Sequence, residues 1–173
     1  MLKLTLLGIL LVPLLLNAKS NTQTIGDALL LAIPLTAYGT TLYLDDKEGQ
    51  TQLYKSFGST LAITEALKYS VREKRPDTNE KDSFPSAHTS LTFSGATFIH
   101  KRYGVKYALV PYLGAIYTGY SRVHSHRHHT QDVLAGAILG MASSWYFTTR
   151  YKNIDIMPIG DTAYQGIQLA YTW

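Results

Sequence analysis

Residues 107–147 read YALVPYLGAIYTGYSRVHSHRHHTQDVLAGAILGMASSWYF and contain two apolar segments, Tyr107–Tyr120 and Val133–Phe147, joined by a polar stretch. Both segments are longer than typical strands. Ala, Leu and Gly outnumber a strand-like alternation of β-branched residues in them, which predicts helices. The polar stretch between them predicts that the second helix turns back along the first.

Four more apolar segments precede this pair, and helix is the better prediction for each. They are Leu4–Leu16, Ile25–Leu44, Leu53–Leu67 and Leu91–Ile99. The sequence therefore predicts an all-α fold, a compact helical bundle of about five or six helices with the active site at one end. Asp27 is predicted to cap the helix over Ile25–Leu44, and Pro34 to kink it. Gly166–Trp173 alternates apolar and polar residues, which indicates a short strand or an extended C-terminal tail.

The 173 residues suffice for one domain. Residues 1–18 are predicted to be a signal peptide or signal anchor, because Lys3 precedes an apolar run and Asn17-Ala18 offers a cleavage point. We expect the helical bundle over residues 19–150 and the tail over residues 151–173. Ile25–Leu44 approaches the roughly 20 apolar residues of a membrane span. A membrane-associated bundle in the bacterial cell envelope is favoured, with a soluble periplasmic bundle as the alternative.

The charged residues gather in two places. Residues 68–82 hold nine charged side chains, and Arg122–Arg127 is a second basic group, within a net charge of only +4. This distribution suggests a local anion site rather than a nucleic-acid face. The chain has no cysteine, so a thiol nucleophile, a disulfide and a Cys-based zinc site are excluded.

Three polar clusters carry residues suited to phosphate chemistry, although each has an ordinary structural explanation as well. Lys68 and Arg75 lie near the end of one predicted helix, where basic residues often serve only as caps. Ser86-Ala87-His88 opens the next helix, where a helix N-terminus can bind an anion. In the third cluster His128 and Asp132 are four residues apart, so the carboxylate could orient the imidazole as a nucleophile or base.

The four histidines between 124 and 129 also raise the possibility of a metal site. His124 and His128 have i, i+4 spacing. However, no Glu completes a His-Glu-x-x-His pattern, and Arg122 and Arg127 would repel a cation. We therefore expect no metal and no other cofactor at this site.

Topology supports a functional reading of all three clusters. Consecutive junctions in an antiparallel bundle fall at alternate ends. The three clusters then meet at one end, whereas Asp45–Gln50 and Lys101–Lys106 lie at the other.

The three clusters resemble the signature motifs of the type 2 phosphatidic acid phosphatase and vanadium haloperoxidase superfamily. The matching residues are Lys68-x6-Arg75-Pro76, Pro85-Ser86-Ala87-His88 and Ser121-Arg122-x5-His128-x3-Asp132. The second motif usually has glycine where this chain has Ala87. The added methyl group would crowd the phosphate if the backbone there required a positive φ.

This resemblance implies a metal-independent phosphatase with a phosphohistidine intermediate. His128 would attack phosphorus, Asp132 would hold its tautomer, and His88 would protonate the leaving group. The implied phosphate-binding residues are Lys68, Arg75, Ser86, Ala87 and Arg122.

The predicted substrate is a phosphomonoester or diphosphate of a membrane lipid, and the predicted active site faces the periplasm. The alternatives are a soluble periplasmic acid phosphatase of broad specificity, a vanadate-dependent haloperoxidase and a non-catalytic His-rich membrane protein. The last of these leaves the convergence of three motifs unexplained.

Overall fold

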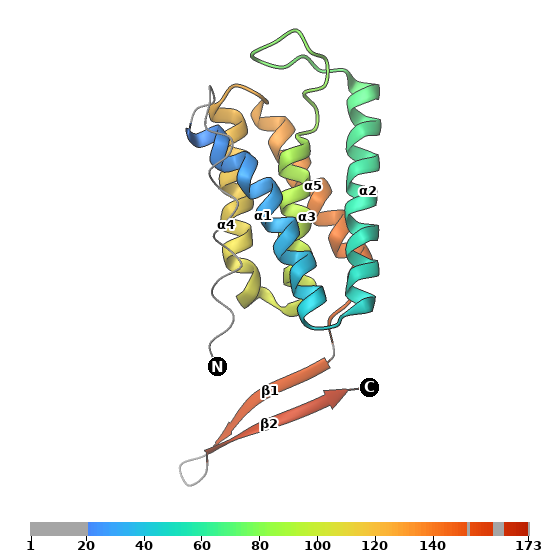
Figure 1. Ribbon diagram of the computed structural model, residues 1–173, viewed down its shortest axis with the longest axis vertical. Coiled ribbons are helices and arrows are strands. Elements are labelled where there is room, and N and C mark those ends of the chain that lie inside the picture. The colour runs from blue at the N-terminus through green and yellow to red at the C-terminus, as the bar shows by residue number, and fades with distance from the viewer. Residues whose placement is uncertain (1–20, 152, 161–164, 173) are drawn as a thin grey trace.

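The computed structural model describes residues 21–151, 153–160 and 165–172 of the chain. Five helices run roughly side by side and a β-hairpin follows them (Figure 1). The elements are α1 (Asn21–Tyr43), α2 (Lys47–Val71), α3 (Ala87–Tyr103), α4 (Val105–His124), α5 (Thr130–Phe147), β1 (Asn153–Gly160) and β2 (Gln165–Thr172). The prediction of an all-α helical bundle is confirmed, and the predicted signal segment lies outside the described residues.

Helices α1 and α2 begin earlier in the chain than the apolar segments they contain. Helix α1 begins at Asn21, so Asp27 lies in its second turn and the prediction that Asp27 caps this helix is wrong. The helix also continues through Pro34. Helix α2 starts after Asp46, whose carboxylate accepts a hydrogen bond from the amide of Gly49 at 2.9 Å. Both helices thus begin in polar residues, before the apolar stretches start.

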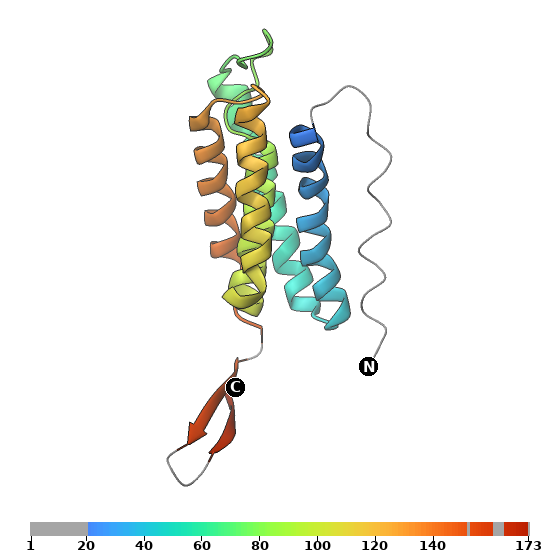
Figure 2. The ribbon, with the colours of Figure 1, turned by 90° about the vertical axis from the view of Figure 1, so that its left-hand side faces the viewer.

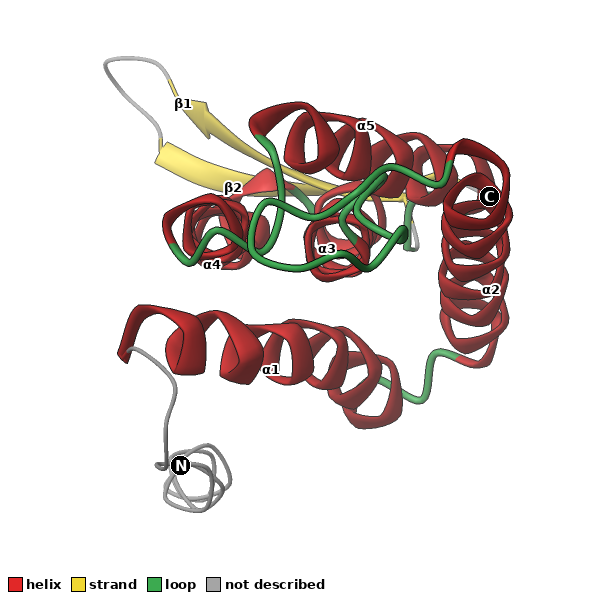
Figure 3. Ribbon diagram, turned by 90° about the horizontal axis from the view of Figure 1, so that it is seen from above, coloured by secondary structure: helices red, strands yellow, loops and turns green. Residues whose placement is uncertain are grey.

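Helix α3 lies at the centre and packs against the other four helices, as the view along the bundle shows (Figure 3). Its closest neighbour is α5, which presents two glycines to it. A Cβ atom at Gly136 would lie 2.6 Å from the carbonyl oxygen of Ser86, and one at Gly140 would lie 2.0 Å from that of Ser90. The two glycines thus allow the helix backbones to touch. This close approach sets the start of α3 beside the start of α5.

The end of the bundle away from the three motifs is held by a buried ion pair. Arg102 in α3 donates to Asp46 through Nη2 at 2.6 Å and Nε at 2.8 Å, and the Tyr103 hydroxyl donates to the same carboxylate at 2.8 Å. Asp46 also caps α2, so one carboxylate joins the beginning of α2 to the end of α3. Gly104, with φ of 107°, then turns the chain directly into α4.

The C-terminal residues form a two-stranded antiparallel hairpin in which Asn153 pairs with Thr172 and Gly160 with Gln165. The predicted strand over Gly166–Trp173 corresponds to β2, whereas β1 was not predicted. Seen from the side, the hairpin lies beyond the end of the helices (Figure 2).

Candidate active site

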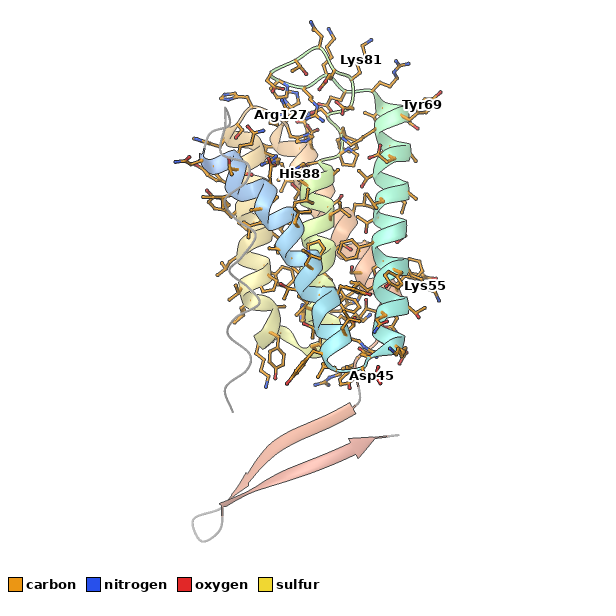
Figure 4. All side chains as sticks on the ribbon, in the orientation of Figure 1. Asp45, Lys55, Tyr69, Lys81, His88 and Arg127 are labelled. Atoms are coloured by element: carbon orange, nitrogen blue, oxygen red, sulfur yellow. The ribbon has the colours of Figure 1, made fainter. Side chains whose placement is uncertain are left out.

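The three motif clusters meet at one end of the bundle, as the topology predicted. His88, Tyr69, Lys81 and Arg127 lie toward this end, whereas Asp45 lies at the other (Figure 4). A cavity of about 770 Å³ opens there. Six basic side chains and three carboxylates line it, which leaves a net charge of +3 when both of its histidines are counted as neutral. The lining residues are Gln23, Asp27, Glu65, Lys68, Tyr69, Arg72, Arg75, Lys81, Asp82, Ala87, His88, Arg122, Arg127 and His128. Such a cavity suits an anionic ligand.

The His128 imidazole lies just before α5 and is held by a backbone carbonyl. Its Nδ1 is 2.8 Å from the oxygen of Ser83. A carbonyl oxygen can only accept, so Nδ1 carries the proton and donates it. In the neutral ring the lone pair is then on Nε2. His128 therefore has the tautomer of a nitrogen nucleophile, and it lines the cavity although it is only 4% exposed.

The surroundings of His128 also keep the ring uncharged. Its pKa is lowered to about 4, chiefly because burial disfavours the charged form and further because Arg75 and Lys68 lie nearby. The carboxylate of Asp132 acts in the opposite direction. At neutral pH the imidazole is therefore unprotonated and able to attack an electrophile.

Asp132 supports His128 less directly than its spacing predicted. Its Oδ2 lies 3.7 Å from Nδ1 of His128, beyond hydrogen-bond distance. The same oxygen accepts from the Ser83 hydroxyl at 2.5 Å and from the amide of His129 at 2.8 Å. Asp132 is fully buried and does not line the cavity. The carboxylate thus fixes Ser83 and the start of α5, and Ser83 in turn orients the imidazole.

Lys68 and Arg75 meet through Asp82 rather than on one helix. Helix α2 ends at Val71, and Arg72 has a left-handed conformation with φ of 52°. Beyond it Arg75 donates to the Asp82 carboxylate through Nε at 2.7 Å and Nη2 at 2.8 Å. The Lys68 ammonium bonds the backbone oxygen of Asp82. These hydrogen bonds from Arg75 are the main reason that the pKa of Asp82 falls to about 2, so this carboxylate stays charged.

The second motif forms the start of α3, but its serine lies behind the cavity. Ser86 is fully buried, its amide donates to the oxygen of Asp132 at 3.0 Å, and its hydroxyl accepts from Thr89 at 3.0 Å. Ala87 and His88 line the cavity instead. Ala87 is the first residue of α3 and is not among the described residues with positive φ. The condition under which its methyl group would crowd the phosphate, a positive φ at Ala87, is therefore not met.

Arg122 and His88 meet at a carboxylate of α1. Arg122 donates from Nη1 to Asp27 at 2.8 Å and from Nη2 to the oxygen of Gln23 at 2.9 Å. His88 Nε2 is 3.1 Å from the same oxygen of Asp27. The third motif is thus joined to the second through α1.

The remaining histidines of the third cluster do not converge on a common point. His124 stacks on Tyr120 with ring centroids 5.3 Å apart, and Nε2 of His129 is 3.2 Å from the oxygen of Lys74. His126 occupies a turn with φ of 55°. Among the residues that the structure describes, no three His, Asp or Glu side chains are placed to share a metal ion.

Three residues of the site escaped the sequence analysis: Ser83, Asp82 and Asp27. Ser83 and Asp82 directly precede the second motif, so a search of the motif's flanks would have raised them as candidates. Asp27 was assigned a capping role. Its position as the single charged residue between Asn21 and Leu44 was the signal that it faces a polar partner.

The sequence of this chain is similar to a known protein family and to lipid phosphatases. The profile of the PAP2 superfamily matches residues 50–155. The lipid A 1-phosphatase of Porphyromonas gingivalis is 40% identical over 82 residues, covering 46% of this chain and 18% of that protein. The lipid A 4'-phosphatase of Helicobacter pylori is 39% identical over 79 residues, covering 46% of this chain and 40% of that protein. The match thus spans less than half the length of either relative.

Two solved structures share the helical arrangement. The crystal structure of Aquifex aeolicus LpxE gives a TM-score of 0.57 at 22% identity and covers 76% of this chain and 88% of that one. The transmembrane PAP2-type phosphatidylglycerolphosphate phosphatase from Bacillus subtilis gives a TM-score of 0.56 at 25% identity, with coverage of 73% and 71%. The bundle is therefore a known fold, with helices that correspond over most of both chains.

Proposed function

The chain belongs to the PAP2 superfamily, and we propose that it is a metal-independent phosphatase that removes phosphate from a membrane lipid through a phosphohistidine intermediate. The observation that carries the proposal is the neutral His128, with its proton on Nδ1, in a cavity of net positive charge. Its relatives named above are lipid phosphatases, which supports a lipid phosphate as the substrate.

The first half of the reaction transfers the phosphoryl group to the protein. Nε2 of His128 attacks phosphorus, the P–O bond to the lipid breaks, and His88 gives a proton to the departing alkoxide. Lys68, Arg75 and Arg122 stabilise the charge on the phosphoryl oxygens. These fixed cations thus provide the charge stabilisation that a metal ion provides in metal-dependent phosphatases. Arginine also suits this task because its planar fork can make paired hydrogen bonds.

The second half returns the protein to its starting state. Water attacks phosphorus, His88 takes its proton, and the P–N bond to His128 breaks to release inorganic phosphate.

Among the remaining motif residues, the amide of Ala87 can contribute to the phosphate site, because the first amides of a helix have no partner within it. Ser86 and Asp132 act from behind the cavity and hold the start of α3 against that of α5.

The outer surface of the bundle supports a location in a membrane. Large apolar side chains are exposed on helices all round it, including Leu31, Leu61, Val110, Leu113 and Ile138. The interior has the opposite character. It holds fully buried Ser and Thr side chains such as Ser56, Thr60, Thr64, Ser90 and Ser94. A soluble protein shows the reverse pattern, whereas lipid solvates an apolar exterior.

Helix length and aromatic residues fit the same interpretation. At 17 to 25 residues, the helices α2 to α5 are about 26–38 Å long, close to the ~30 Å hydrocarbon core of a bilayer. Exposed Tyr69 and Tyr120 lie near the site, and Tyr107, Trp145 and Tyr146 near the other end, where membrane interfaces favour aromatic rings. Among the described helices only α1 contains a stretch that is long and apolar enough to be a candidate span by composition. Buried Ser, Thr and Gly residues, together with charged residues in α2 and α3, lower the mean hydropathy of the others.

The enzymatic proposal predicts phosphate release from lipid substrates in excess EDTA. Purified protein in detergent should be assayed with lipid A phosphates, phosphatidate, prenyl diphosphates and soluble sugar phosphates, with and without EDTA. We expect turnover of at least one lipid substrate, unchanged by EDTA. Loss of that turnover in EDTA with recovery in Mg²⁺ or Zn²⁺ would contradict the metal-independent mechanism. A clear preference for soluble phosphates would favour the broad-specificity acid phosphatase.

We place the chain across the inner membrane with the active site facing the periplasm. Because the protein has no cysteine, single cysteines can report on each end. In spheroplasts a membrane-impermeant maleimide should label Asn79→Cys, in the loop before α3, at once. It should label Lys47→Cys, at the start of α2, only after permeabilisation. Equal labelling of both variants in intact spheroplasts would show that the bundle does not span the membrane.

A further inference from the structure

Helix α1 brings to the site a carboxylate that none of the three motifs contains. Oδ1 of Asp27 is 2.8 Å from Nη1 of Arg122 and 3.1 Å from Nε2 of His88. Asp27 lies outside residues 50–155, the part that the superfamily profile matches. One oxygen therefore joins the phosphate-binding arginine of the third motif to the proton-transfer histidine of the second.

The backbone of α1 is adapted to this contact at the preceding residue. A Cβ atom at Gly26 would lie 2.0 Å from Oγ of Ser121 and 2.7 Å from Nη2 of Arg122. Any side chain at this position would therefore require Ser121 and Arg122 to move. The oxygen of Gln23, one turn earlier, accepts from Arg122 at 2.9 Å. The first two turns of α1 thus pack against Arg122. This packing places the Asp27 carboxylate next to His88.

The chemistry of the three groups determines which nitrogen of His88 exchanges protons. A carboxylate beside a guanidinium is ionised and can only accept. Nε2 of His88 must therefore carry a hydrogen when it bonds Asp27, whether the ring is neutral or charged. The proton that His88 gives up and recovers is then the one on Nδ1. The carboxylate also stabilises the imidazolium relative to the neutral ring.

We propose that Asp27 is a positioning residue for proton transfer, holding Nε2–H of His88 so that Nδ1 protonates the leaving group. This inference rests on the proposed function. In the first half-reaction the Nδ1 proton moves to the alkoxide as the P–O bond breaks, while Asp27 keeps the proton on Nε2. In the second, Nδ1 takes a proton from water as the O–P bond forms. Asp27 touches neither the substrate nor the phosphoryl group in either step.

The test compares Asp27→Asn in the wild-type and His88→Ala backgrounds, with an alkyl phosphate and with p-nitrophenyl phosphate. In the wild-type background the single-turnover rate of phosphoryl transfer from the alkyl phosphate should fall about 10–100-fold, part of the ~10²–10⁴-fold that general acid catalysis contributes. With p-nitrophenyl phosphate the loss should be a few-fold at most, because nitrophenolate leaves without a proton. In the His88→Ala background Asp27→Asn should cause no further loss, since the group it supports is gone.

Asp45→Asn is the matched control, because Asp45 is exposed at the opposite end of the bundle and asparagine tolerates its positive φ. It should leave both rates unchanged. Equal losses with the two substrates, a loss that persists in the His88→Ala background, or faster turnover by Asp27→Asn would each overturn the inference. Absence of turnover in the wild-type protein would instead refute the proposed function itself.

Discussion

Replacement of His128 by alanine should lower turnover on the order of 10⁴-fold or more with every phosphate ester, the scale seen when a nucleophile is removed. No other side chain described at the cavity combines a nitrogen lone pair with this degree of burial: the tautomer of His128 is set by Ser83, and its pKa is about 4. The arginines at the cavity carry a fixed positive charge, so they can bind phosphate but cannot attack it. Good and poor leaving groups should therefore be affected alike.

The measurement is single-turnover kinetics combined with trapping of protein-bound phosphate. Wild-type protein quenched in alkali should retain acid-labile, alkali-stable phosphate, and His128→Ala should retain none. His124→Ala is the control, because that exposed histidine stacks on Tyr120 away from the cavity, and it should behave as the wild type. Phosphate trapped on Ser86, or substantial turnover by His128→Ala, would show that the nucleophile has been assigned wrongly.

The sequence was most informative about how the helices are arranged. Alternating apolar segments and polar junctions predicted the helices, and the alternation of junctions between two ends predicted that Lys68, His88 and His128 would meet. This worked because each apolar segment is long enough to be a helix and consecutive helices run in opposite directions. Helix ends were less predictable. The start of α1 at Asn21 has no apolar signal, which led to the wrong capping role for Asp27.

Contacts that depend on the path of the loop before α3 could not be predicted. Spacing alone placed Asp132 beside His128, yet the described hydrogen bond goes to the oxygen of Ser83, and Asp132 acts through the Ser83 hydroxyl. The motif likewise placed Ser86 on the phosphate, whereas its amide donates to the oxygen of Asp132, its hydroxyl accepts from Thr89, and the residue does not line the cavity. Sequence spacing identifies which residues share a region, but hydrogen-bond partners also depend on backbone atoms that any residue can supply.

The second large effect should come from His88→Ala, and it should depend on the leaving group. This variant keeps the His128 nucleophile, the cationic cavity and therefore the ability to attack phosphorus. It lacks the donor that neutralises the alkoxide, so turnover of an alkyl phosphate should fall by ~10²–10⁴-fold. p-Nitrophenyl phosphate should recover most of the wild-type rate of phosphoryl transfer, since its leaving group hardly needs a proton.

Substrates of graded leaving-group pKa turn this contrast into a quantitative test. In single turnovers the logarithm of the transfer rate should fall much more steeply with leaving-group pKa for His88→Ala than for the wild type, because charge on the departing oxygen is no longer neutralised in the transition state. Hydrolysis of the phosphoenzyme should also slow in this variant, because water loses its base, and acid-labile phosphate should accumulate on His128. Equal slopes of transfer rate against leaving-group pKa for wild type and His88→Ala would show that His88 does not transfer the proton. The absence of phosphoenzyme accumulation with p-nitrophenyl phosphate would show the same. Either result would also remove the functional reason for the Asp27 carboxylate to lie 3.1 Å from Nε2 of His88.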